Sequence, residues 1–246
     1  MTRIPVCPAC LSKPAAMTAE YFCAGCRTPF LNAYPLDENG LCGLCRYGLN
    51  SFDAAYSFGA YEDELRALIH LFKYGKVQTL AKPLGKLLAS VLPRDQRFDL
   101  ILPMPLHWRR RWNRGFNQSN LLAREIARRT GVPLRKVVRR VRNTTAQVGL
   151  TNAKRRDNVA RAFRVKPRQA LGGLRVLLID DVMTTGATAG ACATALKKAG
   201  AKHVTLLTLA RVDRRFVAAQ RKDSAVGFPE SPFSGSFEDA KSGSTA

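Results

Sequence analysis

Two adjacent acids followed by small hydroxyl residues form the stretch of this sequence with the clearest chemistry. Asp180 and Asp181 come directly after the apolar run 176–179, and they precede Thr184, Thr185, Gly186, Ala187 and Thr188. Hydroxyls and a glycine before a helix offer hydrogen-bond donors and free backbone N–H groups to a phosphate. Carboxylates beside a phosphate site need another partner, such as sugar hydroxyls or a metal. A ribose 5-phosphate meets both needs; the alternative is a structural Asp pair in a strand–turn–helix.

The elements around this stretch are expected to place it at the edge of a sheet. Residues 174–179 are predicted as a buried strand, 187–199 as a helix and 203–210 as a further strand. Such alternation indicates an α/β fold with a parallel sheet, whose ligands bind at the carboxyl ends of the strands. The same periodicity arguments predict the remaining elements, namely a strand within 51–61, helices over 62–74, 79–92 and about 118–130, and strands over 98–105 and 134–141.

Positive charge is concentrated in one segment of the chain. The formal net charge is +22, and residues 105–168 hold nineteen Lys and Arg against Glu125 and Asp157. Trp108, Trp112 and Phe116 are interleaved with these cations. A solvated basic face is one interpretation, and a binding site for phosphorylated metabolites or nucleic acid is the other.

Six cysteines occur in three Cys-x-x-Cys pairs: Cys7/Cys10, Cys23/Cys26 and Cys42/Cys45. The chain shows no export signal, so we expect a cytoplasmic protein and metal binding in preference to disulfides. Two such pairs complete a tetrahedral structural Zn2+ site. The set favoured from the sequence is Cys7/Cys10 with Cys42/Cys45, with Cys23/Cys26 able to replace either pair. Reduced thiols without metal are the alternative.

The motif around the acid pair resembles that of a known family. VLLIDDVMTTGAT, over 176–188, is similar to the signature of type I phosphoribosyltransferases that binds 5-phosphoribosyl-1-pyrophosphate (PRPP). Further segments are similar to the ComF/GntX family, so that the resemblance covers about residues 7–212: LFKYG (71–75), PMPLH (103–107), RGFNQ (114–118), TTAQ (144–147) and RDNV (156–159). The resemblance implies an α/β type I phosphoribosyltransferase fold, a parallel sheet flanked by helices, with a small N-terminal zinc-ribbon module.

The resemblance also implies roles for individual residues. Asp180 and Asp181 would be catalytic and would hold the ribose 2- and 3-hydroxyls, while 184–188 would hold the 5-phosphate. Leu106 and His107 would lie in the loop for the pyrophosphate, which brings Mg2+ with it, and Arg109 would follow there. His107 is equally well explained as a surface residue. The basic segment 142–161 is predicted as a lid over PRPP. Lys73 either points into the site or only interacts with the negative dipole end of its own helix.

These observations lead to a functional expectation and an alternative. We expect a zinc-ribbon module over 1–50, a phosphoribosyltransferase domain over 51–215 and a disordered tail over 216–246. The domain would transfer phosphoribosyl from PRPP to an unknown acceptor, and the family links it to natural competence and DNA uptake. The alternative is a PRPP sensor without turnover, or a module that handles single-stranded DNA together with competence proteins of the helicase type. No apolar run is long enough for membrane insertion.

Overall fold

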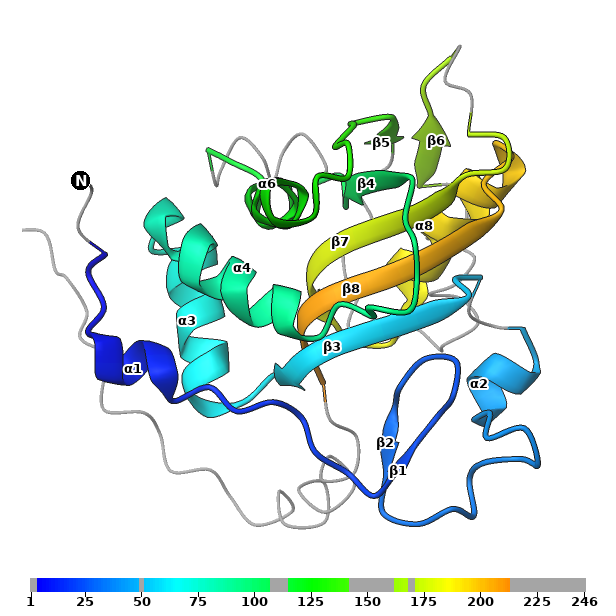
Figure 1. The fold of residues 1–246 in the computed structure, drawn as a ribbon, viewed down its shortest axis with the longest axis horizontal. Coiled ribbons are helices and arrows are strands. Elements are labelled where there is room, and N and C mark those ends of the chain that lie inside the picture. Colours follow the sequence, from blue (N-terminus) through cyan, green and yellow to red (C-terminus); the bar gives the residue numbers. More distant parts are fainter. Residues whose placement is uncertain (1–3, 49–50, 107–114, 142–161, 168–170, 213–246) are drawn as a thin grey trace, which may run out of the picture. The chain divides into compact units, whose positions relative to one another are not determined.

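The computed structural model describes residues 4–48, 51–106, 115–141, 162–167 and 171–212 (Figure 1). Met1–Asp213 forms one compact unit. The predicted lid over 142–161 and the predicted tail over 216–246 lie outside the described residues. Within the described ranges, no helix combines the length and the apolar character needed to cross a bilayer.

Four parallel strands form the central sheet in the order β3–β8–β7–β4 (Figure 1). Their bounds are Ala54–Ala60 for β3, Leu100–Pro103 for β4, Arg175–Met183 for β7 and His203–Arg211 for β8. The central pair β7 and β8 is almost wholly buried along its apolar positions, as the continuous apolar runs predict. The parallel sheet expected from the strand–helix alternation is therefore confirmed.

Helices pack on both faces of this sheet and enclose two apolar cores. They are α3 (Asp63–Lys73), the 3-10 turn η1 (Gln78–Leu80), α4 (Ala81–Ser90), α6 (Gln118–Thr130) and α8 (Ala187–Lys198). Alternate strand residues point to opposite faces, so Leu177 and Ile179 pack with α3, α4 and α6, while Val176 and Leu178 pack with α8. All four long helices lie where the periodicity predicts them.

A small antiparallel hairpin adds to the α8 side. It consists of β5 (Val138–Arg140) and β6 (Phe163–Val165), and Phe163 is buried. The strand predicted over 134–141 is thus shorter, with Leu134 making a separate bridge to Ile101. The sequence analysis missed β6, because three residues carry too little periodicity to be recognised.

The N-terminal cysteine-rich segment, where the structure describes it over 4–48, contains only short elements. These are α1 (Pro8–Ser12), β1 (Tyr21–Phe22), β2 (Pro29–Phe30) and α2 (Gly43–Arg46). The strands β1 and β2 pair antiparallel, so the segment between them is a knuckle that carries Cys23 and Cys26. A second knuckle, at Cys42 and Cys45, leads into α2. With so few buried apolar residues of its own, this module needs another source of stability.

Candidate functional site

The acid pair lies inside strand β7 and not beyond its end. The strand was predicted to stop at Ile179, yet its pairing with β8 continues through Asp180↔Thr208 to Met183↔Arg211. The difference arises because β8 supplies partners for the polar residues, which no apolar pattern within β7 can indicate. The two carboxylates are therefore carried on hydrogen-bonded backbone at the carboxyl edge of the sheet.

A tight turn joins β7 to α8 directly after the acids. Gly186 has φ 79° and ψ −6°, a left-handed conformation that a side chain would strain. The Thr185 hydroxyl accepts a hydrogen bond from the Ala187 amide at 3.3 Å, inside the turn. The turn thus brings the N-terminus of a twelve-residue helix, with its positive dipole end, beside the acid pair.

These residues line one cleft with a volume of about 280 Å³. Most of the predicted PRPP-binding residues that the structure describes are among its walls, namely Leu106, Asp180, Asp181, Thr184, Gly186 and Thr188. Thr185 and Ala187 are not part of that lining, and they are hydrogen-bonded to each other within the turn. His107 and Arg109 lie outside the described residues.

Lys73 reaches into this cleft from the end of α3. Its Nζ atom lies 2.7 Å from Oδ1 of Asp181, and both side chains are only 12% exposed. Of the two interpretations of Lys73 that the sequence allowed, the structure supports the one in which it points into the site. Sequence reasoning could not settle this, because the two residues are far apart along the chain.

Asp180 has a different partner. The Ser119 hydroxyl, on α6, donates to Oδ1 of Asp180 at 2.9 Å, and the Asp181 amide donates to the same oxygen at 2.9 Å. Burial, together with the neighbouring Asp181 carboxylate, raises the pKa of Asp180 to about 7. The Asp181 amide, the Lys73 ammonium and the Ser119 hydroxyl oppose that rise. Sequence analysis did not identify Ser119.

A second cation also lines the cleft. Arg140, on β5, is one of the lining residues, and its guanidinium lies 5.5 Å from the centre of the Phe163 ring. Such stacking fixes the plane of an arginine side chain. Among the described residues the cleft therefore combines two carboxylates with two cations, an arrangement suited to a ligand that carries both hydroxyls and phosphates.

Four thiols gather in the cysteine module. The Sγ atoms of Cys23, Cys26, Cys42 and Cys45 lie within 4.8 Å of one another, and those of Cys26 and Cys42 are 3.7 Å apart. Tetrahedral zinc with Zn–S bonds of about 2.3 Å places its sulfurs roughly 3.8 Å apart, so these residues fit zinc. The other three thiols, Cys26 first, lower the pKa of Cys23 far below its ordinary value, and their hydrogen bonds with Cys23 raise the pKa of Cys42 and Cys45, so the four thiols share protons as one cluster.

The structure brings only one of the two pairs favoured from the sequence into this cluster, because Cys42/Cys45 gathers with Cys23/Cys26 and not with Cys7/Cys10. Cys7 and Cys10 are exposed on α1, where the Cys10 amide donates to Sγ of Cys7 at 3.4 Å. Leu11, on the same helix, packs against the core beneath α3 and α4, which keeps α1 with that core (Figure 1). The β1–β2 hairpin instead brings Cys23 to the second knuckle, since the Cys42 amide donates to Sγ of Cys23 at 3.3 Å.

Arg211 connects this thiol cluster to the strand that carries the acid pair. Its guanidinium donates to the Cys26 carbonyl at 2.7 Å and to the Thr28 hydroxyl at 2.6 Å, and the side chain is 5% exposed. The Thr28 hydroxyl lies 2.9 Å from Sγ of Cys26. In the sheet Arg211 pairs with Met183, next to the turn. The buried residue that contacts the thiol cluster thus neighbours Met183, a residue that lines the cleft.

Comparisons with known proteins agree with this architecture. Residues 117–231 match the phosphoribosyl transferase domain family. The chain is 33% identical to Competence protein F of Haemophilus influenzae over 178 residues, which cover 69% of this chain and 78% of that protein. It is 31% identical to the DNA utilization protein YhgH of Escherichia coli O157:H7 over 214 residues, covering 84% of this chain and 90% of the relative.

Solved structures give weaker matches. The glutamine PRPP amidotransferase from B. subtilis matches 53% of this chain at 25% identity with a TM-score of 0.37, and the chain spans 26% of that enzyme. An adenine phosphoribosyltransferase from Saccharomyces cerevisiae matches 61% of this chain and 77% of its own length, at 16% identity and a TM-score of 0.35.

The predicted fold class is thus confirmed, by the parallel sheet together with the family match over 117–231. The fold is that of a type I phosphoribosyltransferase, with a small N-terminal module whose four clustered cysteines are compatible with a zinc ribbon. Because two curated relatives align with it over most of their length, the chain belongs to the ComF/GntX family.

Proposed function

We propose that this protein binds PRPP in the cleft between β7 and α8 and transfers its phosphoribosyl group to an acceptor. One observation carries the proposal: an acid pair and the start of a helix, reached through a glycine turn, line the same cleft. The family match over residues 117–231 supports it.

The residues of the cleft divide the work by chemical type. The carboxylates of Asp180 and Asp181 accept hydrogen bonds from the ribose 2- and 3-hydroxyls. The segment 184–188 receives the 5-phosphate through its hydroxyls and the backbone N–H groups at the start of α8. In this arrangement Thr184 and Thr188 face the ligand, while Thr185 and Ala187 shape the turn.

The pyrophosphate end would meet positive charge. As pyrophosphate leaves C1, negative charge grows on its oxygens, and nearby cations stabilise that charge. Arg140 lines the cleft, and we assign His107 and Arg109 to the same end. Mg2+ would enter the cleft with pyrophosphate, as its counter-ion. The two acids would not be its main ligands, because Asp180 already accepts a hydrogen bond from Ser119 and Asp181 already forms an ion pair with Lys73.

Titration calorimetry with PRPP and Mg2+ tests the binding. We expect saturable binding to the unaltered protein, weakened at least about tenfold by Asp181→Asn, since a buried hydrogen bond to a charged group is lost. The matched control is Asp95→Asn, at an exposed aspartate outside the cleft. Pyrophosphate release in a screen of amines and nucleobases then tests catalysis. If Asp180→Ala and Asp181→Asn both bind PRPP as the unaltered protein does, the assignment of the cleft is wrong.

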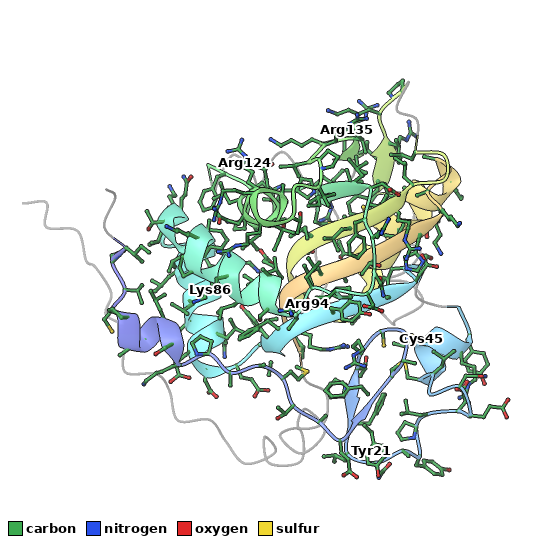
Figure 2. The ribbon with its side chains drawn as sticks, in the orientation of Figure 1. Tyr21, Cys45, Lys86, Arg94, Arg124 and Arg135 are labelled. Carbon is green, nitrogen blue, oxygen red and sulfur yellow. The ribbon has the colours of Figure 1, made fainter. Side chains whose placement is uncertain are left out.

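A second function is favoured by the basic surface and by the names of the relatives. Exposed arginines lie on α6 and after it, and Figure 2 shows Arg124 and Arg135 at the top of the view. Relatives are named for competence and DNA utilization. We therefore propose a role in DNA uptake, as a PRPP sensor or in contact with single-stranded DNA and a helicase-type competence protein. Binding of an oligonucleotide should weaken steeply with salt, and no binding at low salt would exclude the DNA contact.

The metal site and the division of the chain complete the proposal. Zn2+ would be held by Cys23, Cys26, Cys42 and Cys45, and it would replace the apolar core that the module lacks. We divide the chain into the module over 1–50, the transferase domain over 51–215 and a tail over 216–246, in a protein that acts in the cytoplasm. Elemental analysis is expected to give one equivalent of zinc per chain, and folded protein without metal would contradict this assignment.

A further inference from the structure

Three consecutive side chains at the start of α6 contact three different walls of the cleft. Asn117 Nδ2 donates to the Met104 carbonyl at 3.0 Å, after the end of β4. Gln118 Nε2 makes a longer contact of 3.5 Å with the Lys73 carbonyl, at the end of α3. Ser119 Oγ donates to Asp180 on β7 at 2.9 Å. One helical turn therefore connects strand β7, the residue after β4 and the end of α3 around the site.

The polarity of this turn is unusual for its burial. Gln118 and Ser119 are only 1% and 2% exposed. The residues one turn further along the same face of α6, Leu122 and Ala123, are apolar and fully buried. Burying an amide and a hydroxyl costs free energy unless each finds a partner. Ser119 finds its partner in the Asp180 carboxylate. Gln118 finds its partner in the backbone carbonyl of Lys73, the residue whose side chain pairs with Asp181.

The consequence concerns the two carboxylates. Adjacent carboxylates repel each other when both are ionised, and burial increases that repulsion. Each of these two has a donor of its own, Ser119 for Asp180 and Lys73 for Asp181. Gln118 links the two donors. It precedes Ser119 in the chain, and its side-chain amide contacts the backbone carbonyl of Lys73.

We propose that Ser119, Gln118 and Lys73 are positioning residues that hold the two aspartates as separate, ionised acceptors for the hydroxyls of a bound ribose. This inference rests on the proposed binding of PRPP and names residues that act through the aspartates. Asp181 also acts on Asp180, burial and then Asp180 raise the pKa of the Cys192 thiol on α8, and Arg140 lines the same cleft. They are unchanged in the variants below.

The pH dependence of PRPP binding tests the role of Ser119. Binding by an ionised acid pair weakens as the pH falls, with a midpoint set by Asp180, whose pKa is about 7. Ser119→Ala removes a donor that favours the ionised form, so we expect the midpoint to rise by about one pH unit, a tenfold loss below it. Ser119→Thr keeps the hydroxyl and should restore the midpoint. Ser90→Ala, at an exposed helical serine on α4, is the matched control.

Lys73 gives an independent test. Lys73→Met removes the cation beside Asp181, so the midpoint should rise here as well, whereas Lys86→Met, at an exposed lysine of α4, should leave it in place. If Ser119→Ala does not fold, Ser119→Cys replaces it, and its weaker donor should give an intermediate midpoint. Thermal unfolding establishes that each variant is folded.

The possible outcomes separate the two proposals. A midpoint in Ser119→Ala and Lys73→Met equal to that of the unaltered protein overturns the positioning role, while PRPP binding itself would stand. No binding of PRPP by the unaltered protein at any pH overturns the proposed function instead. A midpoint that rises in both variants and returns in Ser119→Thr supports the positioning role.

Discussion

Replacing Arg211 by methionine tests whether the thiol cluster and the sheet form one cooperative unit. The arginine is buried, and its guanidinium donates to the Cys26 carbonyl and the Thr28 hydroxyl. Methionine has a similar length and no charge, so the substitution removes the hydrogen bonds without leaving a buried charge. The Thr28 hydroxyl keeps its contact with Sγ of Cys26, whereas the Cys26 carbonyl loses this charged donor.

The size of the effect follows from those two bonds. A hydrogen bond to a charged group contributes about 1.5–3 kcal/mol, and the burial of the methionine side chain offsets part of the loss. We expect the free energy of unfolding to fall by about 3 kcal/mol. For a chain of this size that corresponds to a decrease of roughly 6–12 °C in Tm. Arg94→Met, at an exposed arginine labelled in Figure 2, should change the free energy of unfolding by less than about 0.5 kcal/mol.

Thermal and urea unfolding, each with and without a chelator, provide the measurement. Removing the metal and removing Arg211 break the same connection, so their effects should be less than additive. The reasoning is refuted if Arg211→Met unfolds within about 1 kcal/mol of the unaltered protein. It is also refuted if chelation lowers the Tm of both proteins equally.

Three further outcomes are expected. Cys23→Ser should lose bound zinc and lower the Tm, while Cys7→Ser should retain one equivalent, as measured by elemental analysis; equal zinc in both would exclude the four-thiol assignment. PRPP affinity should fall as the pH is lowered through about 7, because protonation of Asp180 removes an acceptor, and calorimetry should find this component absent in Asp180→Asn. Gly85→Ala should lower the free energy of unfolding in urea by about 1–3 kcal/mol, since the added Cβ would lie 2.6 Å from a side chain of α6. Gly190→Ala, whose Cβ would have 3.7 Å of clearance, should be neutral or stabilising. The reverse order would contradict the packing of α4 on α6.

Local periodicity predicted most of the fold. The helix expected over about 118–130 is α6, at Gln118–Thr130, because a long amphipathic stripe and a terminal glycine are both local signals. The strand before the acids was recognised from its apolar run, but its last four residues were not. Their pairing depends on Thr208, Ala210 and Arg211 of β8, which lie about thirty residues away in the sequence.

The parts of the site that could not be predicted are contacts between distant segments. Lys73 meets Asp181 only because α3 packs on the face of the sheet beneath that edge. Ser119 left one usable signal, since it lies four residues before Ala123 on the inward stripe of its helix, where an apolar residue is the norm. The pairs of cysteines that cluster were equally hidden, because three pairs of identical spacing are equivalent in the sequence until the β1–β2 hairpin brings two of them together.

The continuation of β7 through the acids has a consequence for selectivity. Each acid of β7 has a protein donor of its own, since Lys73 of α3 pairs with Asp181 and Ser119 of α6 donates to Asp180. A pentose that engages both acids must therefore present two adjacent hydroxyls to this one strand. A 2-deoxy sugar offers one hydroxyl and leaves one buried carboxylate without its ligand partner, so the backbone of the sheet would itself distinguish ribose from deoxyribose.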